Sequence, residues 1–408
     1  MSLEQESIAA PTKMGLVLPG GGARAAYQVG VLRAISDLLP ARSANPFPVV
    51  TGTSAGAVNA TAIAVSADRF RVAVGNLERV WRSFEVGQVF RADALTMLRS
   101  GLHWLLSFIS GGWLLPPPKS LFDNSPLRQL LGEQFDFDGI RRSIAAGNLD
   151  AIALAAAGYI SGRSVSFYES RAGFDPWSRI RRSGEPAKLS LDHLMASVAV
   201  PFLFPPVLMG DEYFGDGAMR EANPFSAAIH LGAQRLLVIG TRNEAIGQSR
   251  VPTCPTFGQI FGYMLDSLFS DGLYADLERL TQLNQIVTRA GQITTDHGVL
   301  RRIDMLVILP SRDLSEIARH HADSLPRPLR ALLRTMGALE RGGGELMSYL
   351  MFQDTFTREL IALGYQDGLE RSSDLRAFLG GLAIESTGAS GLMRRLSSRQ
   401  EQRAKAEQ

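Results

Sequence analysis

The sequence contains a single cysteine, Cys254, so an intrachain disulfide cannot form. No group of cysteine and histidine residues has the spacing of a zinc site, and we expect neither a metal nor an organic cofactor. The formal net charge is only +2 over 408 residues, which gives no reason to expect nucleic acid as a partner. A hydrophobic content of 45% is that of a globular protein able to bury a sizeable core.

Two kinds of apolar segment are also missing. The N-terminal stretch MSLEQESIAAPTKMG is polar and acidic at its start, without the basic-then-apolar order of a signal peptide. No run of about 20 apolar residues has the flanks of a membrane span. We therefore expect a cytoplasmic protein, for which peripheral attachment to a membrane surface stays open.

Short apolar segments that alternate with helical patterns predict an α/β fold. Residues 14–18 read as a strand, residues 23–39 as a helix with one apolar face, and residues 48–51 as a second strand before another helix. This alternation within about fifty residues indicates a largely parallel sheet. Further strands are predicted at 149–157, 164–168, 235–240 and 304–309.

Beyond residue 310 the pattern becomes that of amphipathic helix, from 313 to about 365. The final residues are charged and polar, as in a frayed tail. The expected organisation is a disordered segment at 1–13, an α/β domain at 14–310 with a variable cap at about 83–120, a helical C-terminal extension at 311–393 and a flexible tail at 394–408.

Residues 100–118 contain no Asp, Glu, Lys or Arg. Two glycines and three prolines shorten the helical part of this segment, so it does not suit a membrane span. It is either a buried cap helix with its loop or an amphipathic lid whose apolar side chains meet lipid. On the second interpretation, the candidate lipid-contact residues are Trp104, Leu105, Phe108, Ile109 and Trp113.

The stretch VVTGTSAGAVNATA at 49–62 places Ser54 in a G-x-S-x-G pattern with Gly52 and Gly56. This pattern holds a serine on a sharp turn between a strand and a helix. A serine hydroxyl is a poor nucleophile until a base takes its proton. Ser54 is therefore a candidate nucleophile whose base must lie elsewhere in the sequence.

A glycine-rich loop, LPGGGARAAYQVG, follows the first predicted strand and opens a helix. Its glycine spacing also satisfies the dinucleotide-binding fingerprint, but the next strand lacks the acid that would hold a ribose. Consecutive glycines let backbone N–H groups converge at a helix N-terminus, where they would stabilise an oxyanion. The alternative is an ordinary strand-to-helix turn with a surface arginine. The candidate oxyanion residues are Gly20, Gly21, Gly22, Ala23 and Arg24.

The base could be a histidine or an aspartate. Of the six histidines, His297 alone has a loop context that resembles a catalytic histidine. Asp216 is the stronger candidate, because glycines on both sides of it permit a sharp bend that brings its carboxylate close to another main chain. An ordinary turn aspartate would carry the same Asp-Gly dipeptide.

Together these residues resemble the patatin-like phospholipase family, a group of serine lipid acyl hydrolases. The resemblance spans roughly residues 14–310. Ala25 departs from the family pattern, in which the glycine motif usually closes with Gly. The motifs that carry the resemblance are the glycine loop at 20–25, the serine elbow at 52–56, Asp216-Gly217-Ala218, and the flanking segments 120–127 and 196–206.

The resemblance implies a three-layer α/β/α fold with a mostly parallel central sheet and a helical C-terminal extension. It also implies a Ser–Asp dyad, in which Ser54 attacks the acyl carbonyl and Asp216 is the general base. The residues that support these motifs are Gly52, Gly56, Gly217 and Ala218.

The implied activity is hydrolysis of fatty acyl esters of phospholipids or related lipids. Two alternatives stay open at this point. One is a Ser-His-Asp esterase or thioesterase that uses His297, and the other is a catalytically silent membrane-binding protein of the same fold. The oligomeric state is not indicated by any sequence feature.

Overall fold

The computed structural model describes residues 13–91, 93, 99, 101–103, 106, 107, 109–111, 113, 119–246, 254–291, 293–295, 298–340 and 342–382. His297 and three of the lipid-contact candidates, Trp104, Leu105 and Phe108, lie outside these residues. The expected N-terminal segment, apart from its last residue, and the expected tail also lie outside them.

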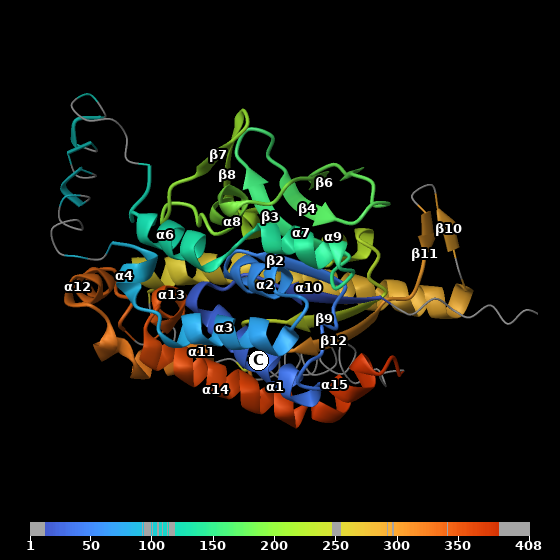
Figure 1. The fold of residues 1–408 in the computed structure, drawn as a ribbon. Helices are drawn as coiled ribbons and strands as arrows, with labels where there is room; N and C mark the ends of the chain where they lie inside the picture. Colours follow the sequence, from blue (N-terminus) through green and yellow to red (C-terminus); the bar gives the residue numbers. More distant parts are fainter. Residues whose placement is uncertain are drawn as a thin grey trace, which may run out of the picture.

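A mixed sheet of ten strands, counted over the described residues, forms the centre of the protein (Figure 1). Its strands are β1 (Met14–Leu18), β2 (Val49–Thr53), β3 (Ala151–Gly158), β4 (Ser164–Ser170), β5 (Trp177–Ser178), β6 (Arg182–Pro186), β7 (Val207–Met209), β8 (Glu212–Asp216), β9 (Arg235–Ile239) and β12 (Asp304–Ile308). The main path runs β12-β9-β1-β2-β3-β4-β6-β5, with β8 on β3 and β7 on β8. The strands from β12 to β3 are all parallel. A separate hairpin joins β10 (Ile293–Thr295) to β11 (Gly298–Leu300).

Helices cover the sheet and extend the chain beyond it. Up to β3 they are η1 (Gly22–Ala25), α1 (Ala26–Leu38), α2 (Ala55–Val65), α3 (Phe70–Arg82), α4 (Val86–Val89), α6 (Ser125–Gln134) and α7 (Asp138–Ala145). Between β6 and β10 they are α8 (Leu191–Ser197), η2 (Gly217–Met219), α9 (Ser226–His230) and α10 (Phe257–Ala290). After β12 they are α11 (Leu314–His320), η3 (Ala322–Ser324), α12 (Arg327–Thr335), α13 (Gly344–Leu350), α14 (Asp354–Glu370) and α15 (Ser372–Leu379).

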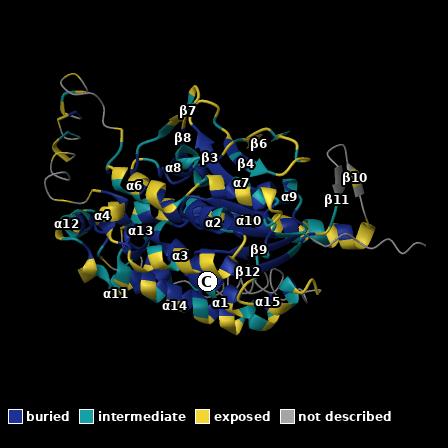
Figure 2. Cartoon of the chain, viewed as in Figure 1, coloured by how far each residue is buried: buried dark blue, intermediate teal, exposed yellow. Residues whose placement is uncertain are grey.

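Successive residues of the central strands face two separate hydrophobic cores. Leu16 and Leu18 belong to the core that includes residues of α1, α2 and α14, whereas Val17 belongs to the core formed with α9 and α10. Because neighbouring strand side chains point to opposite faces, this division puts helices on both faces of the sheet. Figure 2 shows the buried residues concentrated along the sheet and the inner sides of its helices. The predicted three-layer α/β/α fold with a mostly parallel sheet is confirmed.

The six predicted strands coincide with β1, β2, β3, β4, β9 and β12 to within two residues at each end. The helix predicted at 23–39 begins as the 3-10 turn η1 and continues as α1. The helical region expected from 313 to about 365 is divided into α11, η3, α12, α13 and α14, of which α14 is the longest. Pro326 cannot continue a preceding helix, and Gly337 adopts a φ of 73°, so the region is interrupted at both positions.

The C-terminal helical region packs tightly against the sheet domain. A Cβ built on Gly364 of α14 would lie 2.1 Å from the carbonyl oxygen of Tyr27, and one built on Gly30 of α1 would lie 2.1 Å from that of Ile361. Glycine at both positions therefore lets the two helices approach closely. The Tyr27 hydroxyl also donates a hydrogen bond of 2.8 Å to Asp367. Across the described helices, none combines the length and the hydropathy needed to cross a bilayer.

Candidate active site

Ser54 occupies a strained turn between β2 and α2. Its φ of 54° and ψ of −130° lie where a residue with a side chain is rarely found. The turn depends on close packing, because a Cβ on Gly56 would lie 2.0 Å from the carbonyl oxygen of Leu18. The N–H of Ser54 donates a 3.0 Å hydrogen bond to the hydroxyl of Ser197. The G-x-S-x-G pattern thus folds into the sharp strand-to-helix turn predicted for it.

The register of β3 brings Asp216 to this turn. Thr53 pairs with Ala155, and Asp216 pairs with the next residue, Ala156. Since β4 occupies the other edge of β3 along this stretch, β2 and β8 lie end to end on one edge. The carboxyl ends of the two strands therefore meet, and Ser54 and Asp216 come together there.

The carboxylate of Asp216 is fully buried, and only one of its two oxygens accepts a hydrogen bond. Its Oδ1 accepts a 2.9 Å hydrogen bond from the N–H of Ala218, whereas Oδ2 has no hydrogen-bond partner. Burial raises the pKa of Asp216 to about 7, while the Ser54 hydroxyl and the Ala218 N–H act to lower it. A carboxylate that titrates near neutrality and has a free oxygen is suited to accept a proton from a neighbouring hydroxyl.

The glycine loop lies directly against the serine. A Cβ built on Gly20 would be 3.0 Å from the Cβ of Ser54. The hydroxyl of Thr241 donates a 2.9 Å hydrogen bond to the carbonyl of Gly20 and so fixes the loop. Within the described hydrogen-bond network, the buried N–H groups of Gly20 and Gly21 have no acceptor. Unused donors beside a candidate nucleophile are the arrangement that an oxyanion requires.

The guanidinium of Arg24 is engaged elsewhere, in a buried cluster with C-terminal residues and α10. It donates to Ser348 at 2.8 Å, to the Tyr349 hydroxyl at 3.1 Å, to Asp266 at 3.3 Å and to Glu345 at 2.5 Å. Burial lowers the pKa of Arg24, but Tyr349, Glu345 and Asp266 together raise it above its usual value. We expected Arg24 to add positive charge to the oxyanion site, whereas its charge is neutralised by this cluster. Its position ties the glycine loop to α13.

A second carboxyl, Glu221, adjoins the site although no sequence motif marks it. The hydroxyl of Thr53, the residue before Ser54, donates a 2.5 Å hydrogen bond to Glu221. Burial raises the pKa of Glu221 to about 7, Thr53 lowers it, and the charge of Asp216 raises it further. The only sequence signal was its place five residues after Asp216, in the same turn-rich stretch. Ser197 was likewise overlooked, although it lies in one of the flanking segments.

The region around Ser54 is closed to solvent in this conformation. Ser54 is 2% exposed, and the ring of Phe269 from α10 lies over Gly20. A cavity of only about 10 Å³ is lined by Gly20, Glu221 and Phe269, among others. A ligand can therefore reach Ser54 only after side chains or helices around it move.

Histidine does not take part in this arrangement among the described residues. Neither Ser54 nor Asp216 has a hydrogen bond to a histidine there. The described residues also include no group of three or more His, Cys, Asp or Glu placed to hold a metal ion. Ile109 is 71% exposed and Trp113 is 91% exposed, so these two lipid-contact candidates face outward.

Comparisons with known proteins match the region that contains this site. A family model described as patatin-like phospholipase matches residues 16–229, which is more than half of the chain. The structure of VipD from Legionella pneumophila is similar at 12% identity, covering 86% of this chain and 67% of that one, with a TM-score of 0.30. A structure of full-length SpcU in complex with full-length ExoU, from the type III secretion system of Pseudomonas aeruginosa, is also similar. The identity is 13%, the match covers 90% of this chain and 78% of that one, and the TM-score is 0.26. No curated protein matches the sequence.

Proposed function

Because the chain belongs to the patatin-like phospholipase family, we propose that it cleaves fatty acyl esters of phospholipids or related lipids through a covalent intermediate on Ser54. Membership of this family makes the protein a hydrolase of lipid acyl groups. The observation that carries the proposed mechanism is the strained turn of Ser54 beside the partner-free Oδ2 of buried Asp216.

In the first half-reaction, Oδ2 of Asp216 takes the proton from the Ser54 hydroxyl as Oγ bonds to the acyl carbonyl carbon. The resulting oxyanion accepts hydrogen bonds from the free N–H groups of Gly20 and Gly21. Ser54 also stands at the N-terminus of α2, whose dipole stabilises negative charge there. The bond to the leaving alcohol then breaks, and Asp216 returns its proton to that oxygen.

In the second half-reaction, water attacks the acyl-enzyme. Asp216 takes a proton from this water, and the bond between the acyl carbon and Oγ breaks. The proton passes to Oγ, so that a fatty acid leaves and the Ser54 hydroxyl is restored. Asp216 thus acts twice, and its raised pKa makes it a stronger base than an exposed aspartate.

The cap at about 83–120 is proposed to meet the lipid surface. The exposure of Ile109 and Trp113 supports this role, since apolar and aromatic side chains are stabilised at the boundary between water and lipid. Contact with lipid would also provide a cause for opening the closed site around Phe269. On this proposal the protein acts at a membrane surface without spanning the membrane.

The test is product analysis by mass spectrometry after wild type and Ser54→Ala are incubated with a mixed lipid extract. Wild type should release fatty acids and deacylated lipids, and Ser54→Ala should release neither above the rate without enzyme. Equal lipid turnover by the two proteins would contradict the proposal. His297→Ala separates the histidine alternative, because the Ser–Asp mechanism predicts that activity survives this change.

A further inference from the structure

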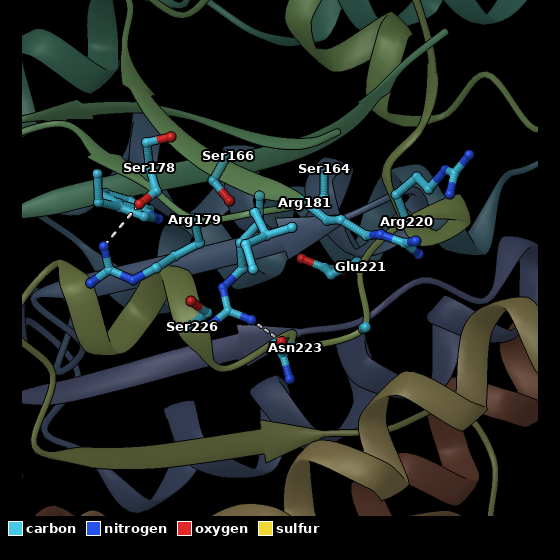
Figure 3. Close-up of a pocket in the computed structure, with 13 residues that line it drawn as sticks. Ser164, Ser166, Ser178, Arg179, Arg181, Arg220, Glu221, Asn223 and Ser226 are labelled. Carbon is cyan, nitrogen blue, oxygen red and sulfur yellow. Dashed lines mark hydrogen bonds between the residues drawn. The ribbon is translucent and has the colours of Figure 1, made fainter. Parts of the chain in front are cut away.

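A cavity of about 740 Å³ opens beside the site, between the outer strands of the sheet and the segment after η2. β4 contributes Ser164 and Ser166, and the β5–β6 segment contributes residues 177–182. The opposite wall comes from residues 220–223 and Ser226. Figure 3 shows the labelled side chains from both walls gathered around this space. We call it the arginine pocket, because four of its lining residues are arginines.

Four arginines line the arginine pocket in the described chain, against the single carboxylate of Glu221: Arg179, Arg181, Arg182 and Arg220. Within the described residues, no ion-pair partner is found for three of them, Arg179, Arg181 and Arg220. The guanidinium of Arg179 donates only to the carbonyl of Ser178, at 2.9 Å. By contrast, Arg171, which follows β4, forms an ion pair with Asp150 at 2.9 Å. The pocket therefore concentrates uncompensated positive charge around one cavity.

Arg182 is a partly buried member of this group. One Nη donates to the side chain of Asn223, but the buried Nε has no hydrogen-bond partner. Burial and the neighbouring charges of Arg279 and Arg179 lower the pKa of Arg182, and the carboxylate of Asp276 offsets this only in part, so the positive charge of Arg182 is not fully compensated. A buried donor without a partner costs free energy that an anion in the pocket would recover.

The other groups in the pocket favour an oxyanion with several acceptors. The hydroxyls of Ser164 and Ser166 make no hydrogen bond within the described chain, and both come from alternate positions of β4 that share one face. Guanidinium groups and hydroxyls arranged around one space suit phosphate, which accepts hydrogen bonds at three oxygens and pairs strongly with arginine. Trp177 adds an apolar side chain to the lining, and its ring stacks with those of Tyr168 and His230 at centroid distances of 5.2 Å and 4.7 Å.

The arginine pocket is connected to the reactive centre through Glu221. This residue lines the pocket and also accepts the hydrogen bond of Thr53, which precedes Ser54 in the chain. Glu221 further lines the small cavity beside Gly20. A ligand group in the pocket would therefore stand on the far side of Glu221 from the Ser–Asp pair.

We propose that the arginine pocket binds a phosphate group, and that this phosphate belongs to the head group of a lipid held for cleavage at Ser54. The second part rests on the proposed function, whereas the first does not. Phosphorylated lipids with a net negative head group should then be preferred over neutral lipids with the same acyl chains.

Binding is measured on the Ser54→Ala protein, so that no turnover interferes. Isothermal titration calorimetry with dihexanoyl phosphatidic acid, with inorganic phosphate and with dihexanoylglycerol compares the lipid phosphate, the free anion and the neutral lipid. Arg181 and Arg220 are exposed, so Arg181→Ala combined with Arg220→Ala is the pocket variant. Arg142→Ala is the matched control, because Arg142 is equally exposed but lies on α7, outside the pocket lining.

The proposal predicts that phosphatidic acid binds more tightly than dihexanoylglycerol, and that the pocket variant weakens this binding about 10-fold or more while Arg142→Ala does not. If phosphatidic acid binds more tightly than inorganic phosphate, the phosphate group that the pocket recognises is that of a lipid head group. Equal affinity for the two supports a site for free phosphate and contradicts the lipid assignment. If neither binds, or if the pocket variant binds as the control does, the pocket is not a phosphate site. Melting curves of each variant establish that it is folded, and the single change Arg181→Ala replaces the double variant if that protein does not fold.

A turnover experiment separates the two proposals. In the active protein, the pocket variant should lower the ratio of kcat/KM for phosphatidic acid to that for diacylglycerol about 10-fold, mainly through KM. An unchanged ratio would contradict the head-group assignment. Phosphate binding that depends on the arginines, in a wild-type protein that hydrolyses no lipid, would support the pocket while contradicting the proposed function.

Discussion

Ser54 and Asp216 come from two strands that end against each other on the same edge of β3, one running toward the site from each direction. The backbone register therefore sets their separation, and the short turns after each strand aim the two side chains. Because Asp216 is buried and its Oδ1 accepts a hydrogen bond from the N–H of Ala218, its carboxylate is held in place before any substrate binds, with Oδ2 left without a partner. Such preorganisation avoids rearrangement during the reaction.

The pH dependence of activity should follow the ionisation of Asp216. Its pKa is raised to about 7, and only the ionised form can accept the serine proton. We expect kcat/KM to rise about tenfold per pH unit below this value and to level off above it. Rates measured from pH 5 to pH 9 on a soluble ester test this. Because Glu221 titrates in the same range, the profile is repeated with Glu221→Gln, and an inflection near 7 that persists belongs to Asp216. A profile with no inflection between pH 5 and pH 9 would contradict the assignment.

Replacing Asp216 with asparagine should lower activity and raise stability at alkaline pH. Loss of the base predicts a fall in kcat of about 100-fold to 10,000-fold.

The stability of the Asp216→Asn protein should also depend on pH. The pKa of Asp216 is about 7 in the folded protein against 3.8 for the free side chain, so between these pH values the folded state holds a proton that the unfolded state has released. The free energy of unfolding of wild type therefore decreases as pH rises through this window, and Asp216→Asn escapes that loss. The Tm of Asp216→Asn relative to wild type should thus be higher at pH 8 than at pH 4, and a difference that does not change with pH would refute the burial argument.

The serine turn should tolerate no side chain at Gly56. A Cβ there would lie 2.0 Å from the carbonyl oxygen of Leu18, so Gly56→Ala must push α2 away from β1. We expect a loss of about 2–3 kcal/mol in the free energy of unfolding, with loss of activity. Gly75→Ala in α3 is the control, because a Cβ added at Gly75 would have no heavy atom within 4 Å. Alanine is the better helix former, so this change should stabilise by about 0.5–1 kcal/mol. Similar denaturant midpoints for the two variants would contradict the packing argument.

The buried cluster around Arg24 should be needed for both stability and the shape of the glycine loop. Arg24→Ala leaves Asp266 and Glu345 buried near Arg242 alone, at a cost of about 3–5 kcal/mol. The exposed pair Arg142–Asp136 provides the comparison, since Arg142→Ala should change stability by no more than about 1 kcal/mol. Urea denaturation of the two variants measures the difference. An equal effect of the two changes would show that the buried cluster contributes no more than a surface pair.

Local features of the site could be predicted from the sequence because local patterns encode them. An apolar strand that runs into glycines specifies a turn, and both the loop before α1 and the turn of Ser54 follow this rule. The glycines beside Asp216 predict a sharp bend in the same way. Its meeting with Ser54 depends on how β3 pairs with two other strands, which no short motif contains.

The remaining contacts join residues too distant in the chain for any pattern to link them. Thr53 and Glu221 are 168 positions apart, and Arg24 and Glu345 are 321 apart. Arg24 therefore looked like an exposed charge beside an oxyanion site, although its partners lie in α10 and α13, far along the chain. The arginine pocket was missed for a related reason, since its cations come from two separate segments that only the folded sheet brings together.

The most direct test of the Ser–Asp mechanism is covalent labelling by a fluorophosphonate, followed by intact-mass measurement and peptide mapping. Folded wild type should carry one adduct, located on Ser54, and Ser54→Ala should carry none. Asp216→Asn should be labelled at least about 100-fold more slowly, because its serine lacks a base. Folded wild type without an adduct on Ser54, or an Asp216→Asn protein labelled as fast as wild type, would contradict this account.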